Sequence, residues 1–160
     1  MMIEIRGVSP HELSEILDLY NYLHATDLPL PDSDQVQSVW DEILHDTKIH
    51  YLVADLDGLL VGSCILTIIP NLTRGARPYG VIENVVTHPD HRRLGIGTQL
   101  LARALQISWE KGCYKVLLMT GSTDKAVHQF YEKAGFNKGV KTGFVAVATD
   151  GVVSGMKPAS

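Results

Sequence analysis

A strand, a basic turn with two glycines and a helix follow one another in the middle of this chain, and they constrain its fold most. The apolar run 81–86 is typical of a strand, and the segment after residue 97 places its apolar side chains on one helical face. Between them lies the turn Arg92-Arg93-Leu94-Gly95-Ile96-Gly97-Thr98. The first amides of a helix lack intrahelical partners and lie at the positive end of its dipole. The sequence therefore predicts a site for a phosphate-rich ligand at this turn.

The turn does not match the two commonest phosphate-binding motifs. No Gly-x-x-x-x-Gly-Lys-Ser/Thr sequence occurs, and the third glycine of Gly-x-Gly-x-x-Gly is missing after Gly95 and Gly97. Glycines let a ligand approach the backbone closely because they lack a Cβ atom. A tight turn into a helix would also explain two glycines, so the turn alone leaves both interpretations open.

The composition is that of a globular protein, and we expect one domain over residues 1–160. Hydrophobic residues make up 45% of the chain and charged residues 20%, which is ordinary for such a domain. The formal net charge of −4 argues against general affinity for nucleic acid or an anionic membrane, so an anion site must be local. No apolar stretch is long enough to span a membrane, and the N-terminus lacks a signal-peptide pattern. These features favour a cytoplasmic protein.

The residues that commonly bind metals are dispersed along the chain. Cys64 and Cys113 fit neither a zinc-ligand spacing nor a disulfide framework. Cys64 lies within an apolar run and is expected to be a core residue. The seven histidines show no His-x-x-x-His spacing. We therefore expect no metal site.

The remaining pattern predicts a mixed sheet with helices on both faces. Ser9-Pro10-His11-Glu12 is typical of a capping box before an amphipathic helix that extends to Leu23, and a second helix should begin near Asp32 or Ser33. Asp57-Gly58 predicts a hairpin between strands at 49–54 and 59–69. Further strands are expected at 3–6, 79–87, 115–119 and 144–148, and further helices after the glycine turn and at 123–134, the last capped by Thr123.

A second motif, Phe130-Tyr131-Glu132-Lys133-Ala134-Gly135-Phe136, lies in the last predicted helix. In this order, and with these elements between them, the two motifs resemble those of the GNAT N-acetyltransferase superfamily, most closely over 81–136. The resemblance implies an α/β (α+β) fold with a central mixed, mostly antiparallel sheet, a splayed parallel pair of strands and helices on both faces. It also implies transfer of an acetyl group from acetyl-CoA to a primary amine by direct attack.

The resemblance further implies where acetyl-CoA binds. The pantetheine arm would lie between the strands 81–87 and 115–119 and bond to the backbone of Val85 and Val86 in the manner of an added strand. Thr120, Lys125 and Phe130 are further candidate contacts. The diphosphate would bind at the amides of Arg92, Arg93, Leu94, Gly95, Ile96, Gly97 and Thr98. Thr123 stands where many members have an asparagine, so a side-chain amide contact to the cofactor would be absent here.

Acetyl transfer needs a neutral amine, a donor to the thioester oxygen and a proton for the departing thiolate. Tyr131 resembles the general-acid tyrosine of the family, and a phenol of pKa about 10 can protonate a thiolate of about 8.5. Glu83 interrupts an apolar strand and is the candidate base, directly or through water. An outward-facing residue on an alternating strand would explain Glu83 equally well. The resemblance assigns the Val86 amide to the oxyanion.

The acceptor amine is less constrained by the sequence. The segments 82–86 and 112–116 resemble the glucosamine-6-phosphate N-acetyltransferase branch, which favours a small amine or an amino sugar, and Arg74 and Arg77 could meet an anionic group of such a substrate. A protein or peptide amine is the alternative. A non-catalytic acyl-CoA sensor and an unrelated phosphate-binding domain also stay open.

Members of the family often pair through a sheet edge or a C-terminal strand, which suggests a homodimer. The apolar segment 145–153 would suit such an interface. A strand within the same chain would explain this segment equally well.

Overall fold

The computed structural model describes residues 2–24 and 26–148. Five strands form one sheet in the order β1-β2-β3-β4-β5, in which the first four are antiparallel neighbours and β4 and β5 are parallel. This mixed, mostly antiparallel sheet confirms the predicted fold class. The strands are β1 (Ile3–Gly7), β2 (Ile49–Leu56), β3 (Leu59–Ile69), β4 (Tyr79–Thr87) and β5 (Val116–Leu118).

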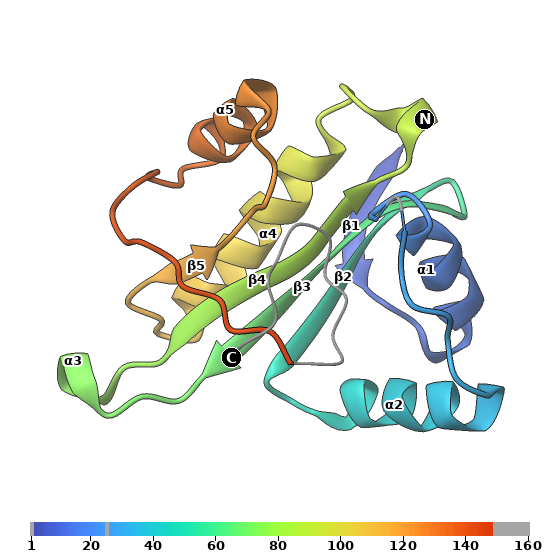
Figure 1. The fold of residues 1–160 in the computed structure, drawn as a ribbon, viewed down its shortest axis with the longest axis horizontal. Coiled ribbons are helices and arrows are strands. Elements are labelled where there is room, and N and C mark those ends of the chain that lie inside the picture. Colours follow the sequence, from blue (N-terminus) through green and yellow to red (C-terminus); the bar gives the residue numbers. More distant parts are fainter. Residues whose placement is uncertain (1, 25, 149–160) are drawn as a thin grey trace.

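Helices cover both faces of the sheet (Figure 1). One face packs against α1 (Leu13–Tyr20) and α2 (Ser33–His45), and the other against α4 (Ile96–Glu110) and α5 (Lys125–Lys133). Short helical turns η1 (Pro10–Glu12), α3 (Thr73–Ala76) and η2 (Pro89–His91) connect the main elements. None of the helices in the described part of the chain is long and apolar enough to cross a membrane.

Two hydrophobic clusters, one on each face, hold these layers together. On the α4 face, Leu66 and Ile82 of the sheet are fully buried against Leu100 and Leu101 of α4. The opposite cluster on the α1 face joins residues of both helices to the sheet and includes Ile16, Leu19, Trp40, Tyr51, Val53 and Val86. Helices cover β2 and β3 on both faces, so nearly all side chains of these strands are buried. This is why their sequences are nearly continuous apolar runs.

Local signals fix where the first helices begin. The Glu12 carboxylate accepts the Ser9 N–H at 2.6 Å, which confirms the predicted capping box. Arg6 forms salt bridges with Glu12 and Asp55, and these hydrogen bonds from the guanidinium hold the pKa of both carboxyl groups below the usual range. The Asp32 side chain accepts the Gln35 N–H at 2.9 Å and caps α2, and the helix begins at Ser33, where it was expected to begin.

Three local expectations were wrong. Asp124, not Thr123, caps α5, since its Oδ1 accepts the Ala126 N–H at 2.8 Å. The predicted strand at 144–148 is irregular, because β5 is only three residues long and offers almost no edge for a further strand. The first helix ends at Tyr20, before the apolar pattern ends at Leu23. Residues 149–153 of the apolar C-terminal segment lie outside the described residues.

Candidate active site

The two parallel strands separate partway along their length. β5 pairs with β4 at Gly80, Val81 and Ile82, and its last paired residue is Leu118. Beyond Ile82, β4 continues through residues 83–87 with β3 as its neighbour on one side only. The splayed pair implied by the resemblance is therefore present, and it leaves backbone groups of β4 available to an extended ligand.

A bulge interrupts β4 where the strands separate. Ile65 of β3 pairs with Glu83, whereas Ser63 pairs with Val86, so β4 carries one extra residue over this interval. That residue is Asn84, whose φ is +52°, and asparagine tolerates this left-handed conformation better than most residues. Because of the extra residue, every side chain after Asn84 points to the face of the sheet opposite to the one that regular alternation would give. Val85 consequently lies on the α4 face and Val86 on the α1 face.

The hydrogen-bond pattern after the bulge determines which backbone groups reach the gap between β4 and β5. The His88 N–H donates to the Val61 carbonyl at 2.8 Å. Since successive residues of a strand direct their N–H and C=O groups to opposite sides, the backbone of Val86 is directed toward β3 and that of Val85 and Thr87 toward the gap. The Val86 amide, expected at the pantetheine and at the oxyanion, is therefore directed toward β3, and the groups directed toward the gap are those of Val85 and Thr87. No signal in the sequence distinguishes Thr87 from Val86, because the direction of each backbone group depends on the pairing with β3.

Glu83 and Tyr131 approach the gap from opposite faces of the sheet. Glu83 is exposed and lies on the α1 side, because it follows the α4-facing Ile82 and pairs with Ile65. Tyr131 of α5 is partly buried against the cluster on the α4 face. Burial raises the pKa of its hydroxyl, and the neighbouring Cys64 and Glu83 add to the rise. The phenol therefore stays protonated at neutral pH, and the Glu83 carboxylate is close enough to influence it.

The glycine turn forms a concave backbone surface at the start of α4. Arg93 and Gly95 have φ values of +64° and +76°, and Gly95 is the N-cap of the helix. Left-handed residues in such a turn direct peptide N–H groups toward a common centre, which suits an anion, and the first turn of α4 adds its free amides. The Arg92 Nε donates to the Thr87 carbonyl at 3.4 Å.

The side chains of this turn differ in their surroundings. Those of Arg92, Arg93, Leu94 and Thr98 are exposed, whereas Ile96 is buried in the cluster on the α4 face, so only its backbone is available to a ligand. Outside the turn, Thr120 and Lys125 are also exposed. The Thr120 hydroxyl accepts the Ser122 N–H at 3.1 Å in the loop before α5.

Gly97 links the two sequence motifs. A Cβ atom added to Gly97 would lie only 2.8 Å from Cζ of Phe130, so the aromatic ring of α5 occupies the space that a side chain at 97 would need. The Phe130 ring also contacts Tyr131, with ring centroids 5.0 Å apart. In the structure, the missing Cβ of Gly97 makes room for Phe130, which packs α5 and Tyr131 against α4.

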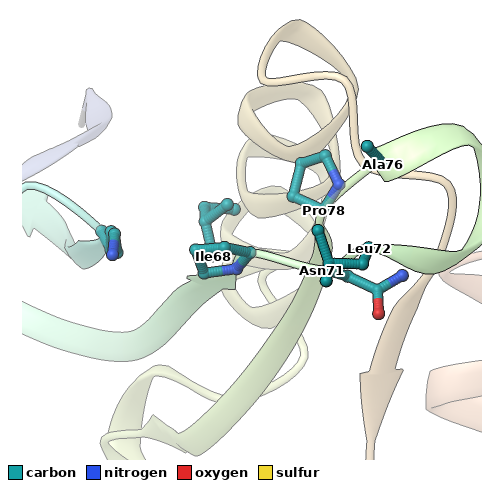
Figure 2. Close-up of a pocket in the computed structure, with 7 residues that line it drawn as sticks. Ile68, Asn71, Leu72, Ala76 and Pro78 are labelled. Carbon is teal, nitrogen blue, oxygen red and sulfur yellow. The ribbon is translucent and has the colours of Figure 1, made fainter.

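A separate hollow of about 750 Å³ lies at the other end of β4, where Ile68, Asn71, Leu72 and Pro78 surround it (Figure 2). Glu83 lies five positions after Pro78 along the strand, which corresponds to roughly 16 Å. The hollow is therefore too distant to contain the reacting groups.

The two arginines expected to meet a substrate anion also lie at that end of β4. The Arg77 guanidinium donates to the carbonyls of Gly112 and Cys113, at 3.2 and 3.1 Å, and ties the loop to the end of α4. Arg74 is exposed in a left-handed segment of the loop, with φ +56°.

Cys64 is a core residue, as predicted. It is fully buried, and burial raises the pKa of its thiol to about 12. Cys113 is buried as well, and both thiols are free. Within residues 2–24 and 26–148, no three or more His, Cys, Asp or Glu side chains are grouped to hold a metal ion.

We expect the Gly97→Ala variant to be less stable than the wild type by about 1–3 kcal/mol, because the new methyl group displaces Phe130. Glycine to alanine within a helix otherwise stabilises by about 1 kcal/mol, so a loss measured by urea unfolding reports the contact. In the Phe130→Leu background the same substitution should cost less. Gly7→Ala is the control, since nothing lies within 4 Å of its added Cβ. Equal losses in both backgrounds would contradict this account.

The model of the Acetyltransferase (GNAT) family matches residues 13–136. A glucosamine 6-phosphate N-acetyltransferase from Trypanosoma brucei brucei is 36% identical over 137 residues, which cover 84% of this chain and 88% of the relative. A solved structure from Agrobacterium tumefaciens str. C58 has a TM-score of 0.85 and 39% identity, covering 91% of this chain and 99% of that one. An aminoglycoside N-acetyltransferase in complex with CoA shares the fold, with a TM-score of 0.74, 20% identity and coverage of 90% and 93%. The splayed strands, the glycine turn and both motifs lie within the matched residues, and the chain belongs to the Acetyltransferase (GNAT) family.

Proposed function

We propose that this N-acetyltransferase transfers the acetyl group of acetyl-CoA to the primary amine of a small molecule, with a phosphorylated amino sugar such as glucosamine 6-phosphate as the first candidate. The observation that supports the proposal is the separation of β4 from β5 after Ile82: Glu83 lies in the separated part of β4, and the glycine turn follows the end of that strand. The resemblance of the chain to a glucosamine 6-phosphate N-acetyltransferase supports the choice of acceptor.

The proposed donor site uses backbone groups almost entirely. The amides of residues 92–98 hold the diphosphate of acetyl-CoA, and the exposed Arg93 adds a positive charge. The backbone of Val85 and Thr87 bonds the pantetheine amides, as an edge strand bonds an added strand. Thr120 and Lys125 lie near the start of α5 and supply outer contacts. Phe130 acts indirectly, since it supports the first turn of α4.

The proposed chemistry divides between the two faces of the sheet. Glu83 takes a proton from the acceptor amine on the α1 side, directly or through one water molecule, so that the nitrogen lone pair can attack the thioester carbon. The nitrogen of the tetrahedral intermediate releases its second proton to water, the carbon–sulfur bond breaks as the amide forms, and Glu83 then returns its proton to solvent. Tyr131 gives its proton to the CoA thiolate on the α4 side and regains one from solvent. The backbone N–H of Val85, which is directed into the gap, stabilises the oxygen of the intermediate.

A direct assay separates this function from its alternatives. Calorimetry with acetyl-CoA, followed by thiol release in the presence of glucosamine 6-phosphate, unphosphorylated glucosamine and peptides with a free N-terminus, should show donor binding and preferred turnover of the amino sugar phosphate. Binding without thiol release for any amine would favour an acyl-CoA sensor. Preferred turnover of peptides would identify a protein acetyltransferase. A folded protein that binds no acetyl-CoA would contradict the proposal.

The roles of the two side chains predict different effects of substitution. Tyr131→Phe should lower kcat on the order of 10²-fold, because the thiolate then leaves without a proton. Its affinity for acetyl-CoA should be nearly unchanged. Glu83→Gln should lower kcat/KM and remove the acidic limb of its pH profile, because the amide cannot accept the proton at any pH. Tyr114→Phe at the far end of the sheet is the matched control. Wild-type turnover in Tyr131→Phe would exclude proton donation, and an unchanged profile in Glu83→Gln would exclude the base.

We also propose that the partner of the chain is a second copy of itself. Three apolar side chains in this region are exposed. Met119 directly follows the short edge strand β5 and is 61% exposed, and Phe144 and Val145, in the segment after α5, are 91% and 60% exposed. Gly143 lies close to Met119, since a Cβ added to Gly143 would be 3.2 Å from the sulfur atom of Met119. The segment after α5 and the edge strand β5 are therefore neighbours.

Light scattering should give the mass of a dimer, and Phe144→Ser should shift the measured mass toward that of the monomer. Leu59→Ser, at another exposed apolar site on the β2–β3 hairpin, should not. A monomer mass for the wild type would exclude this interface.

A further inference from the structure

The strands β4 and β5 are joined at the end of the pair that lies opposite to the gap, which we call the closed end. Only three residues of β5 pair with β4, and β4 is its only neighbouring strand in the described part of the chain. Two backbone hydrogen bonds extend this pairing toward the start of both strands. The Gly80 N–H donates to the Lys115 carbonyl at 3.0 Å, and the Tyr114 N–H donates to the Pro78 carbonyl at 3.1 Å.

Arg77 adds a side-chain contact at the closed end. Its Nε donates to the Gly112 carbonyl at 3.2 Å, and its Nη2 donates to the Cys113 carbonyl at 3.1 Å. Gly112 has a φ of +79° and lies just after α4, and Cys113 lies three residues before β5. The planar guanidinium can bond two carbonyls at once, and its positive charge suits the negative end of the α4 dipole. Arg77 therefore connects the start of β4 to the segment between α4 and β5.

The elements pack closely around Gly80 at the closed end. A Cβ atom added to Gly80 would lie 3.0 Å from Cδ1 of Leu66. It would also lie 3.3 Å from both Oγ of Ser108 in α4 and Cγ2 of Val116 in β5. The missing side chain thus lets α4 and β5 approach the same point of β4, where a small displacement of either element is felt by the other.

Lys115 contributes a further contact between the two strands. Its ammonium group lies 5.1 Å from the ring centroid of Tyr79 and 5.0 Å from that of Tyr114. Tyr79 is the first residue of β4, and Tyr114 lies two residues before β5. A cation over an aromatic face is attracted by the ring and not by the hydroxyl group.

The helix α4 lies along β4 and is attached to it at both ends (Figure 1). Near the glycine turn, the Arg92 Nε donates to the Thr87 carbonyl. At the closed end, Arg77 makes the corresponding attachment. Because β5 leaves β4 after Leu118, its course beyond that residue depends on how its start is held. The width of the gap between β4 and β5 therefore depends on the closed end.

We propose that Arg77 is a positioning residue for acetyl-CoA: it holds the start of β5 against β4 and thereby sets the width of the gap for the pantetheine arm. This inference rests on the proposed function. Arg77 lies six positions before Glu83, roughly 20 Å along the strand, so it acts through β5 and not on the reacting groups. A gap that already has the correct width binds an extended ligand more tightly, because less ordering is needed on binding.

The test is calorimetry of Arg77→Met with two ligands, acetyl-CoA and ADP. ADP contains a diphosphate but no pantetheine arm, so it reports the glycine turn alone. Arg77→Met should raise the Kd of acetyl-CoA about tenfold, because hydrogen bonds from a charged donor are strong, and should change the Kd of ADP by less than about twofold. The KM for acetyl-CoA should rise in parallel, while kcat at saturation stays within about twofold.

Two further variants distinguish the hydrogen bonds of Arg77 from its charge. Arg77→Lys keeps the charge without the planar pair of donors and should restore only part of the affinity for acetyl-CoA. Arg74→Met is the matched control, since Arg74 is an exposed arginine of the same loop. It should leave the Kd of both ligands unchanged.

Hydrogen exchange measured by mass spectrometry provides a readout that does not depend on activity. Arg77→Met should accelerate exchange in the peptide that contains residues 112–118 and leave the peptide that contains 92–98 unchanged. If Arg77→Met does not fold, Arg77→Lys should show the same pattern with smaller changes.

Three results would overturn the proposal. An unchanged Kd of acetyl-CoA would mean that Arg77 does not influence the gap. Equal losses for acetyl-CoA and ADP would indicate a general loss of structure. A higher KM for the amino sugar phosphate, with unchanged affinity for acetyl-CoA, would instead assign Arg77 to the anionic group of the acceptor. A wild-type protein that binds no acetyl-CoA would contradict the proposed function, so the two failures are distinguishable.

Discussion

Backbone hydrogen bonding along β4 changes from two-sided to one-sided after Ile82, and the rest of the site depends on this change. Up to Ile82 the strand is an ordinary member of the sheet, buried between its neighbours. Beyond Ile82 its outer N–H and C=O groups have no partner in β5. Unpaired backbone groups near a protein core are unfavourable unless water or a ligand satisfies them. A strand-like ligand is therefore the natural complement of this part of β4.

The helices on the two faces then supply different parts of the site. α4 begins beside the end of β4, so its free amides and the glycine turn lie at one end of the gap. α5 depends on α4 for its position, because the Phe130 ring packs where Gly97 has no side chain. α1 and α2 act on the other face through Tyr20, Tyr51 and Trp40. The two sides of the gap are thus built by separate clusters on opposite faces of the sheet.

Much of this architecture could be predicted because local signals agreed with the final structure. Asp57 and Gly58 both have positive φ values, as the hairpin signal required. Asp32 caps α2, and Cys64 is buried in the core. Other local signals failed because competing residues were equally suitable: Asp124 caps α5 next to Thr123, and the apolar residues 144–148 lack an edge on which to form a strand. The backbone of Thr87, rather than that of Val86, faces the gap because β4 contains a bulge. A prediction from strict alternation along the strand does not include such a bulge.

The sequence by itself determined the identity and order of the elements, the glycine turn, the Phe130-Tyr131 motif and the family, because these depend on residue types at fixed spacing along the chain. Only the tertiary structure decided that Glu83 and Tyr131 approach one gap from opposite faces, that Gly97 accommodates Phe130, and that β4 bulges at the left-handed Asn84. Those relations arise from pairing register and from side chains that are distant in sequence. One additional residue in a strand reverses the face of every residue after it, and its position is set by the neighbouring strand rather than by the local sequence.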